Sequence, residues 1–328
     1  MVIKFREPPI GRRLKISVCI ATYNQSPFIG DCIMSVLMQI CPADLEILVG
    51  DDCSTDDTAD VVQSISDLYP GRVTLLRRTA NLGPSQNYQD MISRATGDYI
   101  AHLDGDDFWI PGKLAAQLEF FKSNPDCSAV YTNAYVVNSV GEMTATFTGS
   151  HPPRFDTRYL LQGHNFLNHS SMMYRADLRG TLVGIVGEFI DYRMHLRLSR
   201  FGDLGFVNRH LVVYRTGVAA SMSASASDKV RALYWESLCD SAIADLPAKS
   251  LVAGKSSLIA VIICDSLRRG RASYALSWSK RAWRESTGQG WSVLLGTTRV
   301  VTSLLGRSIR HRLGELIAGR TIRVAHEQ

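Results

Sequence analysis

The first half of the chain alternates between two hydrophobic patterns. Short runs of apolar and β-branched residues predict buried strands at 15–22, 45–50, 72–76 and 98–103. Apolar residues at helical spacing predict helices over 27–40 and 84–95. A third helix is predicted between them, from the capping pattern that begins at Ser54 to Pro70, which ends it. Because strands that alternate with helices usually form a parallel sheet covered on both faces, the pattern predicts a mostly parallel, Rossmann-like α/β fold.

The second half of the chain is less regular. We expect strands at 128–137 and 169–175, a helix at 191–201 and a short strand pair at 202–215. Small polar residues at 220–227 are typical of a loop or linker, and a helical pattern follows to the end of the chain.

Polar clusters follow each of the four predicted strands of the first half. They are Thr22-Tyr23-Asn24, Asp51-Asp52, Asn81 with Gly83, and Asp104-Gly105-Asp106. Ligands of open α/β sheets bind at the carboxyl ends of the strands, where these clusters would meet. The spacing therefore predicts one binding site at this edge of the sheet.

Three carboxylates, Asp104, Asp106 and Asp107, fall within four residues at the end of a buried strand. Such like charges repel unless a cation lies between them. Mg²⁺ or Mn²⁺ prefers oxygen ligands and is often shared with substrate phosphates, so we expect a divalent cation and a diphosphate here. The alternative is a surface turn, since Asp and Gly are common turn residues. The neighbouring polar clusters and the bulky pair Phe108-Trp109 disfavour it.

Other chemistries fit the sequence less well. A haloacid-dehalogenase-type phosphatase carries its nucleophilic Asp-x-Asp on the first strand, whereas this motif follows the fourth. A dinucleotide-binding domain needs G-x-G-x-x-G after its first strand, where this chain has ATYNQSPF. A nucleotidyltransferase would carry a Gly-rich basic loop at the same place. An EF-hand needs a longer series of ligands.

Four ordered motifs resemble the bacterial family 2 glycosyltransferases of the GT-A fold. They are SVCIATYNQSPFIGDCIMSVLMQ, EILVGDDCSTDDT, NLGPSQNY and GDYIAHLDGDDFWIPGKLAAQLEFF, within a match over about 15–217. The resemblance implies an inverting, metal-dependent hexosyltransferase. It would move a sugar from a nucleoside diphosphate, a UDP-sugar being favoured, to a hydroxyl of a lipid-linked or polysaccharide acceptor. The implied process is synthesis of exopolysaccharide, capsule or O-antigen.

The resemblance also implies roles for single residues. The donor-binding residues would be Thr22, Tyr23, Asn24, Asp51, Asp52, Asn81, Asp104 and Arg215. Asp51 would hydrogen-bond the base, with Asp52 as the weaker candidate. Arg215 would face the diphosphate, an ordinary surface arginine being the alternative. Asp104 would face the ribose or a metal-bound water, and Asp106 would bind the metal. Asp107 fits the motif but receives no role.

A catalytic base is implied by the segment DYRMHLRL, which selects Asp191. Glu188 is the reserve candidate. The alternative for Asp191 is a helix N-cap, a position that Asp favours anyway. His195 follows Asp191 by one helical turn, and His169 opens a segment that lines the acceptor side in relatives. Both histidines could face the site, although a packed or surface position is the favoured interpretation for each of them.

The charge is unevenly distributed. Residues 229–328 carry a net charge of +9 and residues 1–228 a net charge of −4. We therefore expect a glycosyltransferase domain over 1–225, with a nucleotide-binding half at 15–110 and an acceptor half at 111–225, and a basic helical region over 226–328. Residues 255–328 are predicted to contact anionic membrane through basic residues and tryptophans, or to cap the domain. The apolar core at 255–267 is shorter than the ~20 residues of a bilayer span.

Composition indicates the cellular location and the class of partner. The seven cysteines form no C-x-x-C motif, and the N-terminus shows no secretion signal. We expect a cytoplasmic protein, peripheral on the inner face of the membrane. No nucleic-acid-binding motif accompanies the basic charge. A second class of function is a non-catalytic, nucleotide-sugar-binding partner subunit.

Overall fold

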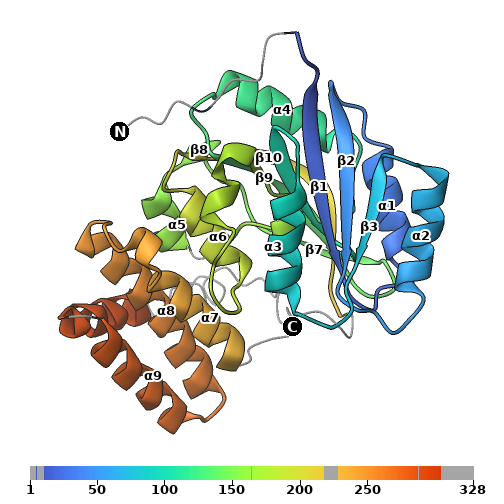
Figure 1. Ribbon diagram of the computed structural model, residues 1–328. Helices are drawn as coiled ribbons and strands as arrows, with labels where there is room; N and C mark the ends of the chain where they lie inside the picture. Colours follow the sequence, from blue (N-terminus) through green and yellow to red (C-terminus); the bar gives the residue numbers. More distant parts are fainter. Residues whose placement is uncertain (1–4, 6–10, 164, 218–227, 287, 304–328) are drawn as a thin grey trace, which may run out of the picture. The chain divides into compact units, whose positions relative to one another are not determined.

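The computed structural model describes residue 5 and residues 11–303, apart from 164, 218–227 and 287. Contacts within the chain define two compact units, Met1–Asp245 and Leu246–Gln328. The first unit contains a large mixed sheet with helices around it, and the second is helical (Figure 1). The linker expected at 220–227 lies outside the described residues.

The first four predicted strands form one parallel array. They are β1 (Leu14–Thr22), β2 (Ala43–Asp51), β3 (Val73–Arg77) and β4 (Tyr99–Asp104). Their order in the sheet is β3-β2-β1-β4, and every neighbouring pair is parallel. The carboxyl ends of all four strands therefore meet at one edge, as the sequence pattern predicts.

The rest of the sheet is contributed by the second half of the unit. Its strands are β5 (Phe108–Trp109), β6 (Ala129–Val137), β7 (Met143–Thr146), β8 (Arg154–Phe155), β9 (Met173–Arg175) and β10 (Leu204–Arg215). The short β9 lies between β4 and β6 and runs antiparallel to both. It thereby joins the nucleotide-binding and acceptor halves into one ten-stranded sheet.

Two expectations for the second half are corrected. Residues 202–215 do not form a strand pair, because Leu204–Arg215 is a single strand that pairs with β6 throughout. The register shifts between Val207 and His210, which marks a β-bulge. The bulge contains the polar residues Asn208 and Arg209, which are typical of a turn between two strands. The strand expected at 169–175 begins instead with a 3₁₀ turn, η1 (His169–Ser171), and only its end pairs as β9.

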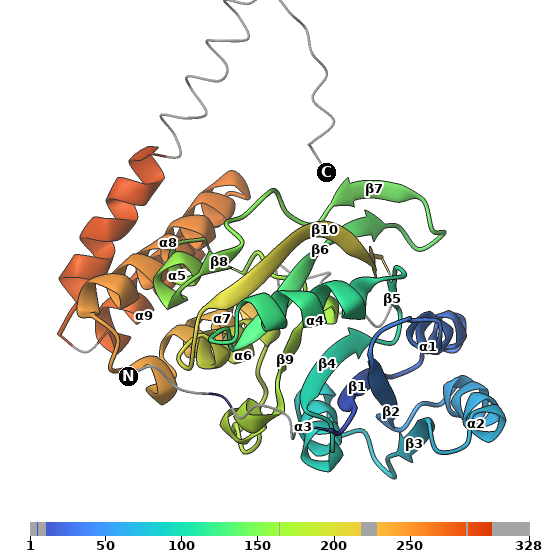
Figure 2. The same cartoon turned by 90° about the horizontal axis from the view of Figure 1, so that it is seen from above.

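The helices cover both faces of the sheet (Figures 1 and 2). Three helices pack their apolar residues against one face: α1 (Ile29–Leu37), α2 (Thr58–Leu68) and α4 (Lys113–Ser123). On β1, Ile16, Val18 and Ile20 alternate toward this core, as the period of two requires. The helix α3 (Pro84–Arg94) lies on the opposite face and buries Met91 and Ile92.

The first unit also contains the remaining short helices and α7. These elements are α5 (Thr157–Gly163), η2 (Ala176–Thr181), α6 (Asp191–Leu198), α7 (Asp228–Leu238) and η3 (Ser241–Ile243). The rings of Tyr192 on α6 and Tyr234 on α7 lie 5.5 Å apart. Asp240 accepts from Arg193 and Arg197 at 2.6 and 2.8 Å. These contacts join α7 to the first unit, which ends at Asp245, and the domain boundary expected at 225 stays a prediction.

The second unit contains α8 (Ala248–Arg268), α9 (Ala272–Glu285) and a helical segment at 290–303. Ser256 Oγ on α8 donates to the backbone carbonyl of Val293 at 2.9 Å. With 21 residues, α8 is long and apolar enough to cross a membrane. The apolar core expected at 255–267 was shorter because the helix begins seven residues earlier, at Ala248. Buried helices of soluble proteins pass the same test, so this finding alone assigns no membrane span.

Candidate active site

A cavity of about 550 Å³ opens at the carboxyl ends of the parallel strands. Each of the four polar clusters contributes to its wall: Thr22 from β1, Asp52 after β2, Asn81 after β3 and Asp104 from β4. Every lining residue in the described part of the chain belongs to the first unit. The convergence of the four clusters, expected from strand order, is thus seen in the structure.

The wall of the cavity includes most of the predicted site residues. Those that line it are Thr22, Tyr23, Asp52, Asn81, Asp104, Asp106 and Asp191. Three others, Asn24, Asp51 and Arg215, lie beside the cavity without forming its wall. Each of these three has a structural contact that explains its position.

The side chains of Asn24 and Asp51 hold loops behind the wall. Asn24 has a left-handed backbone, with φ of 51°, and its Oδ1 accepts from the backbone N–H of Thr55 at 2.8 Å. Asp51 is fully buried and accepts from the backbone N–H of Ser54 at 3.3 Å. The two residues shape the loops after β1 and β2.

The neighbouring carboxylate, Asp52, organises the wall itself. Its two oxygens accept from the backbone N–H groups of Leu82 and Gly83, both at 2.8 Å. These bonds draw the loop after β3 to the end of β2. Asn81 reaches the cavity as a result.

The acidic turn after β4 brings Asp104 and Asp106 to the cavity. Asp104 Oδ1 lies 2.9 Å from Nε2 of His102, which sits two residues earlier on the same face of the strand. Burial and then the charge of Asp104 raise the pKa of Asp106 to about 6. The Arg215 guanidinium opposes this shift, and its Nε donates to the backbone carbonyl of Asp106 at 3.2 Å. The turn is therefore crowded with negative charge that these contacts offset only in part.

The third carboxylate of the turn, Asp107, serves as an anchor. It is buried and accepts from the hydroxyl of Ser170 at 2.5 Å and from the backbone N–H of Arg215 at 2.8 Å. Burial, followed by the charges of Asp106 and Asp104, raises its pKa well above the ordinary range. Asp107 thus fastens the turn to η1 and to the end of β10, a role that the motif did not reveal.

Asp191 begins α6 and faces the cavity from the acceptor side. The N-cap position belongs to Ile190, so the carboxylate of Asp191 is not the cap that its residue type suggested. Its Oδ2 accepts from Asn165 Nδ2 at 2.9 Å, and its Oδ1 accepts from the backbone N–H of Tyr192 at 2.8 Å. Burial raises the pKa of Asp191 to about 6.

The reserve candidate, Glu188, lies elsewhere. Its carboxylate is paired with Lys229, with an Oε2–Nζ distance of 2.7 Å, and it is absent from the described wall of the cavity. The geometry therefore favours Asp191 over Glu188 for any chemistry inside the cavity.

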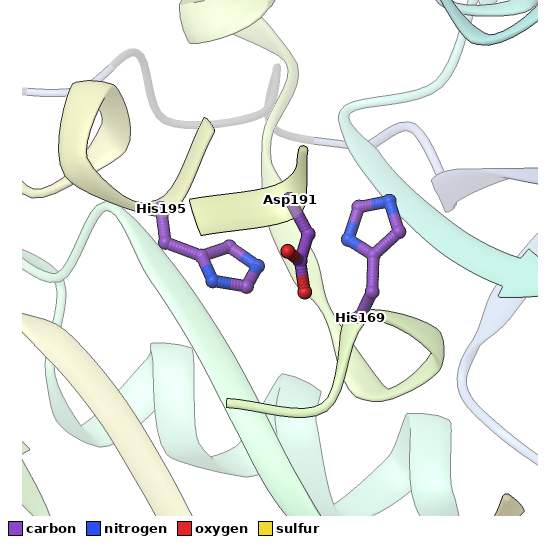
Figure 3. A group of neighbouring side chains, drawn as sticks. All are labelled: His169, Asp191 and His195. Atoms are coloured by element: carbon purple, nitrogen blue, oxygen red, sulfur yellow. The ribbon is translucent and has the colours of Figure 1, made fainter. Parts of the chain in front are cut away.

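Two histidines flank Asp191 (Figure 3). His195 is fully buried, and burial lowers its pKa to about 3. His169 lines the cavity, and its ring lies against that of His102, tilted by 31° with centroids 3.8 Å apart. His169 thus faces the cavity, whereas His195 is packed in the interior next to Asp191.

Three residues of the site were not singled out by the sequence. His102 had a usable signal, because a histidine inside an apolar strand and two residues before Asp104 must share its face. Asn165 and Tyr234 also line the cavity, yet they lie in segments without a motif. Only the folded arrangement brings them to Asp191.

Comparison with known sequences gives a family match. The family model for glycosyl transferase family 2 matches residues 17–179. An uncharacterized protein of Mycobacterium tuberculosis is 26% identical over 304 residues, covering 90% of this chain and 83% of that protein. The chondroitin synthase of Escherichia coli is 28% identical over 209 residues, covering 63% of this chain and 29% of that protein.

Comparison with solved structures extends the likeness to the fold. Staphylococcus aureus TarS, in complex with UDP-GlcNAc, matches with a TM-score of 0.58 at 14% identity, covering 83% of this chain and 92% of that chain. The mannosyltransferase PcManGT from Pyrobaculum calidifontis, with GDP-Man and Mn²⁺, has a TM-score of 0.50 at 18% identity and covers 89% of each chain. These likenesses confirm the predicted GT-A α/β fold.

Proposed function

Because the chain belongs to glycosyltransferase family 2, we propose that it transfers a sugar from a UDP-sugar to an acceptor hydroxyl, with inversion, during bacterial polysaccharide synthesis. The predicted class of enzyme, a glycosyltransferase, is confirmed by the family match. One observation carries the rest of the proposal: Asp52, Asp104, Asp106 and Asp191 lie around one cavity although they come from distant segments.

The donor would occupy the half of the cavity formed by the parallel strands. Thr22, Tyr23 and Asn81 supply hydroxyl, aromatic and amide groups for the nucleoside. We place Asp52 rather than Asp51 beside the base, because Asp52 lines the cavity and Asp51 is buried behind it. Arg215 supports the acidic turn from outside the wall and so acts on the diphosphate only indirectly.

The acidic turn has the chemistry of a site for Mg²⁺ or Mn²⁺. Asp104 and Asp106 present hard oxygen ligands, and burial followed by the charge of Asp104 raises the pKa of Asp106; a cation would neutralise that charge. These two residues would hold the ion. When bound, it supplies positive charge next to the departing diphosphate.

The acceptor side of the cavity supplies the base. In a direct displacement, the oxygen of the acceptor hydroxyl attacks the anomeric carbon. A carboxylate oxygen of Asp191 takes the proton from this hydroxyl during the attack. The bond to the diphosphate oxygen breaks on the opposite face, which inverts the configuration. Asn165 fixes the carboxylate through its 2.9 Å hydrogen bond, so the base keeps one orientation.

The second unit is proposed to contact anionic membrane, which suits a lipid-linked or polysaccharide acceptor. Trp283 on α9 and Trp291 are 49% and 71% exposed, with their rings 6.5 Å apart. Lys280 and Arg284 lie on α9 close to Trp283 in sequence. Exposed tryptophans among basic residues are typical of helices that lie in a membrane interface. This arrangement would keep the enzyme at the inner face of the membrane.

The membrane proposal is tested by co-sedimentation with vesicles. The wild type is expected to sediment with phosphatidylglycerol vesicles and to remain in solution with phosphatidylcholine vesicles. W283A/W291A is expected to lose most of the bound fraction, because both interfacial anchors are removed. Equal sedimentation of the variant and the wild type would mean that the tryptophans are no membrane anchor.

Calorimetric titration with UDP, dTDP and GDP, each with and without Mn²⁺, tests donor binding. We expect UDP to bind in a metal-dependent way and D106N to lose this binding. D67N, which changes an exposed carboxylate on α2, is the matched control and should bind as the wild type does. If the folded wild type binds none of the three nucleotides, the donor assignment is wrong.

The base is tested separately from donor binding. D191N should lose at least 1,000-fold in kcat, since the general base is removed, but should bind UDP with Mn²⁺ unchanged. A non-catalytic partner subunit would instead bind the nucleotide without turnover, and D191N would change neither property. Transfer by D191N at the wild-type rate would exclude Asp191 as the base.

A further inference from the structure

A second cluster of ligand atoms lies at the wall of the same cavity and shares no residue with the acidic turn. His169, Asp191 and His195 each offer one donor atom, and these three atoms lie within 4.8 Å of one another. In Figure 3, a ring nitrogen of each histidine points toward the Asp191 carboxylate, from either side of it. The three residues come from η1 and α6.

The two nitrogens that face Asp191 have no partner in the described part of the chain. These atoms are His169 Nδ1 and His195 Nε2, and both are buried. A buried polar nitrogen without a partner costs free energy, because its hydrogen bond to water is lost and not replaced. A ligand that accepts electron pairs from both rings and from the carboxylate would remove this cost.

Hydrogen bonding sets the protonation of His195. Its Nδ1 lies 3.1 Å from Oδ1 of Asn165, whose amide nitrogen already donates to Asp191. Asn165 Oδ1 can only accept, so Nδ1 of His195 carries the hydrogen. The Nε2 atom is then left with a lone pair directed at the carboxylate. This is the form of histidine that binds a metal, and Asn165 orients both the imidazole and the carboxylate.

His169 is held in a matching position. Its ring lies against the ring of His102, tilted by 31° with centroids 3.8 Å apart, and the centroids of His169 and His195 lie 5.8 Å apart. The His102 imidazole is itself fixed by its 2.9 Å contact with Asp104. The chain thus orients both imidazoles before any ligand arrives.

From this geometry we infer that His169, Asp191 and His195 form a binding site for Zn²⁺, distinct from the pair Asp104 and Asp106. Two imidazole nitrogens and one carboxylate oxygen are a usual zinc ligand set with one open position, whereas an all-oxygen pair suits Mg²⁺ or Mn²⁺. Zinc bonds of about 2.0–2.2 Å place ligand atoms about 3.3 Å apart. The three side chains therefore close slightly around the ion.

Zinc at this site has a consequence that rests on the proposed function. The carboxylate of Asp191 would be coordinated and so unable to take a proton from the acceptor. Zn²⁺ would then inhibit transfer while leaving nucleotide binding at the acidic turn intact. The cavity would hold two cation sites of different chemistry, one that supports the reaction and one that stops it.

The test uses the full, untagged protein without nucleotide. Zn²⁺ binding is measured by calorimetry, and Co²⁺ serves as a spectroscopic probe because nitrogen ligands give it visible absorption. We expect one site, with H169N and H195N each binding Zn²⁺ at least tenfold more weakly. H210N is the matched control, since its imidazole stacks on Tyr135 of β6, and it should bind as the wild type does. If only one of the two histidine variants folds, loss of Zn²⁺ binding in that variant is sufficient to support the site.

The same titrations separate this site from the donor site. D106N should keep Zn²⁺ binding and lose metal-dependent UDP binding. If the folded wild type binds UDP with Mn²⁺ but no Zn²⁺, or binds Zn²⁺ as tightly in H169N and H195N, the zinc site is wrong and the proposed function stands. If Zn²⁺ binds as expected but UDP does not bind, the proposed function is wrong and the zinc site stands.

Discussion

At the scale of single residues, the glycine of the acidic turn is as constrained as the carboxylates beside it. A Cβ added to Gly105 would lie 2.5 Å from Gln25 Oε1 and 2.9 Å from Thr22 Cβ. Gln25 is flexible, but the Cβ of Thr22 belongs to the end of β1 and moves only with the strand. The close approach of the two chain segments therefore requires glycine between Asp104 and Asp106.

G105A is expected to weaken UDP binding at least tenfold in the presence of Mn²⁺, because the turn must move away from Thr22. It should also lower the free energy of unfolding by ~1–3 kcal/mol through overpacking. Calorimetry and urea unfolding measure the two effects. G149A is the control, since no atom lies within 4 Å of its added Cβ and its φ is ordinary. Wild-type affinity in G105A would contradict the expected clash.

If Asp191 is the base, as proposed, its protonation gives the reaction a pH dependence. Burial raises its pKa to about 6, and only the ionised carboxylate accepts a proton. The rate at saturating donor and metal should be constant above pH 7 and fall about tenfold per pH unit below about 6. Saturation matters because the pKa of Asp106 is also about 6, so donor affinity falls in the same range. A rate that is unchanged from pH 7 to 5 would exclude this assignment.

At the scale of elements, the position of α6 depends on one buried carboxylate. Asp240 follows α7 and accepts from Arg193 and Arg197, two residues on the same face of α6. The Asp240 side chain is 1% exposed and each arginine side chain is 17% exposed. Since α6 begins with Asp191, this ion-pair cluster also determines where the proposed base lies.

D240N should lower the free energy of unfolding by about 3 kcal/mol at pH 7, because two partly buried guanidinium groups lose their charged partner. D245N is the control: its carboxylate is 70% exposed and pairs with Arg200 at the surface, so the loss should stay below ~1 kcal/mol. Urea unfolding at pH 7 measures both variants. Equal stability of D240N and the wild type would show that Asp240 does not hold α6.

The pH dependence of this effect has a definite sign. Hydrogen bonds from Arg197 and Arg193 overcome the effect of burial and lower the pKa of Asp240 to about 2, below its ordinary value of ~3.9. The ionised form is thus favoured in the folded state. Its contribution to stability is present above about pH 4 and is lost as the pH falls toward 2. The difference between the wild type and D240N should shrink over this interval, and a constant difference would contradict the assignment.

At the scale of the whole molecule, the proposed chemistry and the proposed membrane contact belong to different units. The described cavity wall ends with Tyr234, and the first unit ends at Asp245. The exposed tryptophans Trp283 and Trp291 belong to the second unit. Donor binding and membrane binding should therefore be separable.

A chain that ends at Asp245 is expected to stay folded and to bind UDP with Mn²⁺ within twofold of the full chain. It should no longer sediment with anionic vesicles. A chain that ends before Asp228 is the comparison, because it also lacks α7 with Val230 and Tyr234 of the cavity wall. Loss of UDP binding on removal of the second unit alone would show that the two functions are not separable.

Local patterns in the sequence were sufficient for much of this description. The period of two in the strands, the helical spacing between them and the polar residues after each strand are properties of neighbouring residues. Together with the rule that parallel strands share their carboxyl edge, they place Thr22, Asp52, Asn81 and Asp104 around one cavity. The four motifs led to the same family as the comparison did.

Contacts between distant segments were decided only by the tertiary structure. The insertion of β9 between β4 and β6 brings η1, with His169 and Ser170, against β4 and its acidic turn. This packing makes Asp107 an anchor, and the packing of η1 near α6 groups His169 with Asp191 and His195. No local period encodes these pairings, because they depend on strand order and on the packing of segments that lie far apart in the sequence.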